Sequence, residues 1–64
     1  MEIYVIRDNY DIKFLESING NGITTDYDLK KALIFEDIEK AKKILEFLED
    51  DDYVIQEIIF KDIE

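Results

Sequence analysis

Cysteine, histidine, proline and tryptophan are all absent from this chain of 64 residues, and glycine occurs only twice. Without cysteine the chain cannot form a disulfide, and without cysteine and histidine it lacks the usual ligands of zinc, copper and haem. We therefore expect no metal and no cofactor.

No apolar run is long enough to span a bilayer, and the residues after Met1 lack the basic start and apolar centre of a signal peptide. We expect a soluble, cytoplasmic protein.

Small size limits the core. Residues 1–64 are predicted to form a single domain. A domain of this size buries only about 60% of the surface that its unfolded chain exposes. Disulfides and metals often supplement such a core, and neither is expected here. The chain therefore needs either an efficient core or a partner.

The formal net charge is −9 and is unevenly distributed. Residues 44–64 carry eight acids and one base, whereas residues 1–43 carry nine acids and seven bases. Phosphates would be repelled by this charge, so we expect no direct binding to nucleic acid and none to an anionic membrane. The expected partner is a basic protein surface.

Hydrophobic periodicity predicts an α+β domain, with a small, mainly antiparallel sheet of three to four strands and one helix packed across it in β-β-α-β order. Asp37 is the expected N-cap of the helix. Phe47 lies about 60° outside its apolar stripe and is expected to be only partly covered. Within residues 23–35 we predict a short helical turn, then a short strand or buried anchor at 33–35. The other predicted elements are a strand at 2–8, a turn at 8–11, a strand at 11–16, a loop at 17–22, the helix at 37–50 and a strand at 53–61.

The strands at 2–8 and 53–61 carry apolar residues on both faces, whereas one helix covers only one face of a sheet. Three arrangements would cover the second face. A second copy could dock there as a homodimer, with three self-association residues: Tyr4, Ile55 and Ile59. The loop at 17–35 could fold over it instead. The third is a tyrosine patch facing another protein, made of Tyr4, Tyr10, Tyr27 and Tyr53.

The run "EDDD" at residues 49–52 stands where the predicted helix end is already negative. An exposed acid there costs about 0.3–1 kcal/mol at low salt, so helix stability does not explain the run. It is either a solubilising turn or an acidic patch that docks on a basic groove. A calcium site is a weaker reading because the EF-hand spacing is missing. The docking hypothesis assigns these partner-binding residues: Glu46, Phe47, Glu49, Asp50, Asp51, Asp52, Tyr53 and Glu57.

Three motifs, "TTD", "KKALIF" and "EDIEKAKKILEFL", lie within residues 23–48. In these motifs the segment resembles small acidic proteins encoded by phages and mobile elements of low-GC bacteria. The residues that carry the similarity are Thr25, Ala32, Phe35, Ala41 and Leu48, and they are structural. Some tiny acidic phage proteins inhibit host defence nucleases, including CRISPR effectors, often by occupying a nucleic-acid site. The resemblance therefore implies a nuclease or CRISPR effector as partner, in the host cell cytoplasm.

An enzyme is not expected, because the commonest general base and the best nucleophile are both absent. The predicted function is a non-enzymatic protein-binding module. It would be a phage-type, anti-CRISPR-like inhibitor whose acidic surface competes with nucleic acid for a host defence or nucleic-acid-handling protein. The alternative is a self-associating structural module whose acidic surface serves only solubility.

Overall fold

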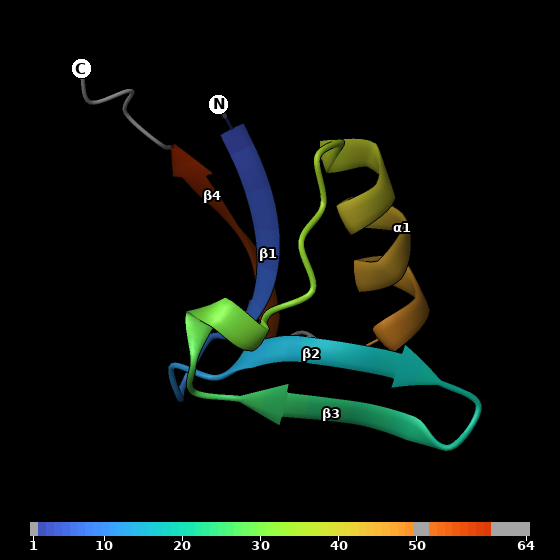
Figure 1. Ribbon diagram of the computed structural model, residues 1–64. Coiled ribbons are helices and arrows are strands. Elements are labelled where there is room, and N and C mark those ends of the chain that lie inside the picture. Colours follow the sequence, from blue (N-terminus) through green and yellow to red (C-terminus); the bar gives the residue numbers. More distant parts are fainter. Residues whose placement is uncertain (1, 50–51, 60–64) are drawn as a thin grey trace.

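The computed structural model describes residues 2–49 and 52–59, which form one antiparallel sheet of four strands and one α-helix (Figure 1). The strand order in the sheet is β3-β2-β1-β4. The predicted α+β class is confirmed, with one strand more before the helix than the predicted order contains. The elements are β1 (Glu2–Asp8), β2 (Phe14–Asn19), β3 (Gly22–Asp26), the 3₁₀ helix η1 (Leu29–Lys31), α1 (Ile38–Leu48) and β4 (Tyr53–Ile59).

β1 and β4 form an unbroken antiparallel ladder along the full length of both strands. The ladder continues one step further, where the Asn9 N–H donates to the Asp52 carbonyl at 2.6 Å. Branched residues fill both strands and suit a pleated, half-buried surface. The strand predicted at 53–61 is present as far as Ile59, and residues 60–61 lie outside the described part of the chain.

The hairpin of β2 and β3 replaces the loop that the sequence predicts at 17–22. Gly22 has a φ of 125°, a conformation that glycine adopts without steric cost. The Asn19 side-chain oxygen accepts from the Asn21 N–H at 2.8 Å and tightens the turn. The predicted loop is therefore confirmed only at residues 20–21, because the residues on either side of this tight turn pair as strands. Both strands are short, and β2 begins with two adjacent buried residues, Phe14 and Leu15, so the alternation is weak.

The linker, residues 32–37, runs beside β1 where β2 has turned away from it (Figure 1). β1 pairs with β2 at Arg7 and Phe14. Further along β1, Phe35 exchanges both backbone hydrogen bonds with Tyr4, at 2.7 and 2.9 Å. The short strand predicted at 33–35 is therefore present as an isolated bridge.

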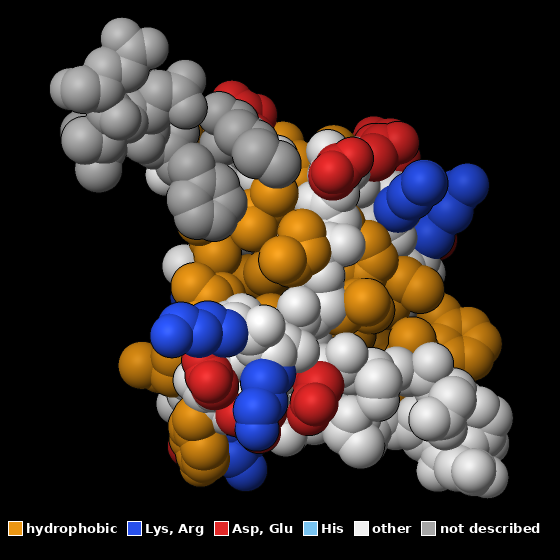
Figure 2. Space-filling view, viewed as in Figure 1, with side chains coloured by type: hydrophobic (Ala, Val, Ile, Leu, Met, Phe, Trp, Pro, Cys, Tyr) orange, Lys and Arg blue, Asp and Glu red, His pale blue; other side chains and the backbone are white. Residues whose placement is uncertain are grey.

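Alternate residues of β1 point to opposite faces of the sheet. α1 packs on the face of Ile6, which is fully buried and lies opposite Ile55 of β4. On the other face, Val5 packs with Phe14, Ala32 and Ile58. Ala32 follows η1, so the later part of the predicted 17–35 loop covers the second face. Apolar side chains still reach the surface along the linker (Figure 2). An open depression of about 350 Å³ there is lined by Ile3, Val5, Asp28, Leu29, Lys30 and Ile34.

α1 begins with a cap that its sequence supplies. The Asp37 side chain accepts from the Glu39 N–H at 2.9 Å, which confirms the predicted N-cap. The apolar stripe faces the sheet, with Ala41 fully buried and Ile44, Leu45 and Leu48 half-buried. Phe47, outside the stripe, is 72% exposed. The helix ends before Glu49, which takes left-handed angles of φ 51° and ψ 30°. Within the described residues, no helix is long and apolar enough to cross a membrane.

Candidate functional site

One carboxylate shapes the loop between β1 and β2. Asp8 Oδ1 accepts from the N–H of Tyr10 at 2.8 Å and from that of Asp11 at 3.3 Å. The Asp8 N–H donates to the Lys13 carbonyl at 2.8 Å and closes the loop. Aspartate favours such turns because its side chain bonds nearby backbone groups. Because the loop reaches Lys13, the strand predicted at 11–16 begins later, as β2.

Two large apolar side chains project from this loop into solvent. Tyr10 is 78% exposed and Ile12 is 68% exposed. Single exposed apolar residues are ordinary, but two of them flanked by carboxylates form a compact contact surface. Sequence reasoning places Tyr10 only in a general tyrosine patch and assigns Ile12 to a strand. The signal available in the sequence was the turn "DNYDI", which presents both residues.

Asp52 lies beside this loop although it is distant in the sequence. The bond from the Asn9 N–H to its carbonyl at 2.6 Å brings the end of the acidic run to the loop. Asp50 and Asp51 belong to the same run and lie outside the described residues. We call the resulting surface the acidic tip; it consists of Asp8, Tyr10, Asp11, Ile12 and Asp52.

The basic side chains nearest to the acidic tip make other contacts. Arg7 Nη1 donates to the Asp8 carbonyl at 3.2 Å. Lys13 Nζ lies 5.1 Å from the centre of the Tyr27 ring, a cation–π contact. Within residues 2–49 and 52–59, neither Asp8 nor Asp11 forms a salt bridge. The exposed Asp11 carboxylate can therefore meet basic groups of a partner, whereas Asp8 is half-buried and its Oδ1 already accepts two backbone hydrogen bonds.

The predicted partner-binding residues occupy three places in the structure. Asp52 and Tyr53 lie at the start of β4, beside the β1–β2 loop. Glu57 lies opposite Tyr4, further along the same ladder. Glu46 and Phe47 are on the last turn of α1, and Glu49 caps it. Asp50 and Asp51 lie outside the described residues. The acids are therefore spread along the sheet and helix, and the structure adds Asp8 and Asp11 to one of the three places.

Phe47 borders an apolar depression of about 310 Å³, lined by Ile18, Asn19, Gly20, Ile44 and Phe47. The charges around it are mixed. Lys43 precedes Phe47 by one helical turn and shares its side of α1, whereas Glu46 lies about 100° around the helix. Phe47 can serve as an apolar anchor, with charges of both signs near it on α1.

Carboxylates also gather around the hydroxyl of Tyr4. This hydroxyl donates to Glu2 Oε2 at 3.5 Å, and Glu57 lies directly across the ladder. Partial burial, and then the charges of Glu2, Glu57 and Asp37, raise the pKa of Tyr4 above its ordinary value of 10.0. The nearby N-cap Asp37 shows that Tyr4 lies on the α1 side of the sheet.

The predicted self-association residues lie on this same side. Tyr4 and Ile55 are half-buried on the face that α1 covers. Ile59, at the end of β4, is 63% exposed. α1 therefore occupies much of the face on which a second copy is predicted to dock, and the exposed part is the end of β4.

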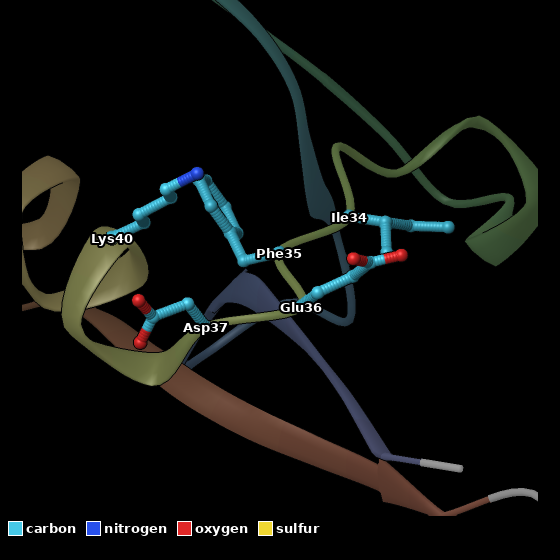
Figure 3. A pocket seen from close by; sticks show the side chains of 5 residues that line it. All are labelled: Ile34, Phe35, Glu36, Asp37 and Lys40. Atoms are coloured by element: carbon cyan, nitrogen blue, oxygen red, sulfur yellow. The ribbon is translucent and has the colours of Figure 1, made fainter.

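A further open depression of about 530 Å³ lies where the linker meets α1 (Figure 3). It is lined by Ile34, Phe35, Glu36, Asp37 and Lys40. Figure 3 shows the Phe35 ring and the Lys40 side chain extending on the same side of the linker, whereas Glu36 points away toward Ile34. Among the described residues, no group of three acidic side chains is arranged to hold a metal ion.

Comparison of the chain with protein-family models, with curated proteins and with solved structures finds no match. The resemblance of residues 23–48 to small phage proteins therefore stays a prediction. The acidic tip is the surface on which a functional proposal can be based, because it joins exposed apolar side chains to carboxylates.

Proposed function

We propose that this protein is a non-enzymatic binding module that docks its acidic tip on a basic protein surface. The observation that carries the proposal is the hydrogen bond from Asn9 to Asp52 at 2.6 Å. It joins Asp52, the last residue of the acidic run, to a loop that exposes Tyr10 and Ile12. Acids and apolar anchors from two distant parts of the chain thus form one surface.

The two kinds of side chain have different roles in such an interface. Tyr10 and Ile12 lose their exposed apolar surface on docking, and interface energy concentrates in buried anchors of this kind, tyrosine above all. The carboxylates of Asp8, Asp11 and Asp52 steer the approach of a basic partner and disfavour acidic ones. A net charge of −9 extends this steering beyond the contact itself.

The partner class follows from this chemistry. A surface rich in lysine and arginine, with a pocket for an aromatic ring, is typical of grooves that stack bases and bind phosphates. The protein would act as an inhibitor by occupying such a groove in a nucleic-acid-handling protein. A host defence nuclease or CRISPR effector is the partner that the phage-like resemblance implies.

The test compares three variants of the immobilised protein. Tyr10→Ala removes the main anchor, and Asp11→Asn removes one charge from the acidic tip. Glu36→Gln removes the same charge from the linker, away from the tip, and is the matched control. Lysate of a low-GC bacterial host is passed over each protein, eluted with a salt gradient and identified by mass spectrometry.

A supporting result is a basic nucleic-acid-binding protein that wild type and Glu36→Gln retain and that salt releases. Its purified form should bind Tyr10→Ala about 30-fold more weakly, as expected for a loss of about 2 kcal/mol at an interface anchor. Asp11→Asn should slow association more than it speeds dissociation. A partner that binds all four proteins equally would show that the acidic tip is not the docking surface.

A further inference from the structure

β4 is an edge strand, and its outward backbone groups can be identified from the ladder. The linker exchanges both hydrogen bonds with Tyr4, so the N–H and C=O of Tyr4 point away from β4. The N–H and C=O of the neighbouring residues in β1 point toward β4. Those of Val5 therefore bond with the backbone of Gln56, the residue opposite it. By the same alternation, the N–H and C=O of Ile55 and Glu57 point to the open side of β4. Within the described residues, no other strand pairs with this side.

This edge has little of the usual protection against pairing with another strand, because Glu57 is the one charged residue in Tyr53–Ile59. Such edges are blunted by proline, lysine, bulges or short length. The chain has no proline, Tyr53–Ile59 contains no lysine, and its ladder with β1 is unbroken. The other edge strand, β3, is shorter, and its pairing with β2 is interrupted between Leu15 and Ser17.

We propose that β4 pairs antiparallel with β4 of a second copy, around a two-fold axis that passes beside Gln56. In this register Ile55 lies opposite Glu57 of the second copy. The two residues exchange both backbone hydrogen bonds, and symmetry repeats the exchange on the other side of the axis. The two sheets become one continuous sheet. This interface shares no residue with the acidic tip and does not rest on the proposed function.

Charge disfavours the neighbouring register in which the axis lies at Glu57. A two-fold axis at Glu57 would place that carboxylate directly opposite its own copy, and like charges in this position destabilise a strand pair. With the axis at Gln56, Glu57 faces Ile55 and the two Gln56 amides face each other across the axis. An amide is both donor and acceptor, so the pair can hydrogen-bond.

The apolar side chains also match in this register. Val54 faces Ile58 of the second copy on one side of the sheet. On the other side, Ile59 faces Tyr53 of the second copy, which gives a partner to a side chain that is 63% exposed in the single chain. The interface therefore uses Ile55 and Ile59 of the predicted self-association set, whereas Tyr4 lies outside it. The contact is along an edge and leaves α1 in place.

The absence of native cysteine gives a direct test. Residues that face each other in a non-hydrogen-bonded antiparallel pair have Cα atoms about 4.5 Å apart, within the range that a disulfide spans. Gln56→Cys therefore places two thiols in bonding position across the axis. Thr24→Cys places a thiol at another exposed position, on β3 at the opposite edge, and is the matched control. Gln56→Lys places two ammonium groups face to face in the dimer and one exposed lysine in the monomer.

Wild type should sediment as a concentration-dependent dimer, and the dimer should strengthen at high salt because two chains of charge −9 repel each other less. Under mild oxidation Gln56→Cys should cross-link about tenfold faster or more than Thr24→Cys, because only its thiols meet in disulfide geometry. Gln56→Lys should weaken the dimer about fivefold or more.

Two results would overturn the proposal. One is a wild type that stays monomeric at the highest soluble concentration in high salt. The other is a dimer whose Gln56→Cys variant cross-links no faster than Thr24→Cys. The salt response also separates this interface from the acidic tip, since binding of a basic partner weakens as salt rises.

Discussion

Replacing Glu49 by glycine should stabilise the protein. Glu49 follows the last residue of α1 and holds left-handed angles of φ 51° and ψ 30°, which are strained for a residue with a Cβ. Its carboxylate also stands at the negative end of the helix dipole. Glycine at this position relieves both, and it is the residue that helices most often use there.

The size of the effect follows from three contributions. The left-handed conformation costs a non-glycine residue about 1–2 kcal/mol. Glycine lowers this gain by about 0.4–1 kcal/mol, because an unfolded chain with glycine at this position loses more conformational entropy on folding. Removing the carboxylate from the helix end contributes about 0.3–1 kcal/mol at low salt. Their sum favours glycine by about 1–2 kcal/mol, which in a domain of this size raises Tm by about 7–15 °C.

The assay is denaturant and thermal unfolding followed by circular dichroism. Glu49→Gln is the control, because it removes the charge and keeps the Cβ. At low salt Glu49→Gln should gain only the charge contribution, and at about 1 M salt that gain should vanish through screening. The extra gain of Glu49→Gly over Glu49→Gln should survive at high salt. If Glu49→Gly is no more stable than Glu49→Gln, the left-handed cap does not carry the strain argued for it.

Two other predictions concern the α1 side of the sheet. Because the folded state raises the pKa of Tyr4, stability is complete below the ordinary pKa of 10.0 and is lost as pH rises through the folded value. Between about pH 8 and pH 11, the free energy of unfolding should therefore fall less steeply with pH for Tyr4→Phe than for wild type. The same slope for both proteins would contradict the effect of the nearby carboxylates on Tyr4. Asp37→Ala should cost about 1 kcal/mol at neutral pH, because the Glu39 N–H loses its cap, whereas Asp37→Ser should retain most of the stability.

The elements that the sequence predicts well are those with strong local signals. The helix follows from one capping aspartate and an apolar stripe at helical spacing, and both are local properties. The strands β1 and β4 follow from runs of branched and aromatic residues. The acidic end of α1 is visible as the run at 49–52. These features need no knowledge of which segments meet.

The hairpin of β2 and β3 shows where local reasoning fails. The segments 14–19 and 22–26 are short, the second is mostly polar, and their pairing is interrupted near Ser17. Such strands are stabilised by pairing with the partner strand and the linker beside them, so their own residues predict a strand only weakly. The exposure of Ile12 has the same origin, because the Asp8 turn ends the strand pairing before Ile12 can join it.

The candidate surfaces depend on contacts between distant segments. Local composition marks Asp52 as acidic and Tyr10 as aromatic, but the bond from Asn9 to Asp52 joins them, and no periodicity encodes that bond. The same holds for the sheet. The apolar residues on both faces of β4 indicate that both faces need to be covered. They do not indicate that β4 lies at an edge of the sheet, which the strand order decides. The pattern of apolar and polar side chains can be read from the sequence alone, because it depends only on neighbouring residues. Which backbone edge stays open and which charges become neighbours follow from pairings that only the folded chain can form.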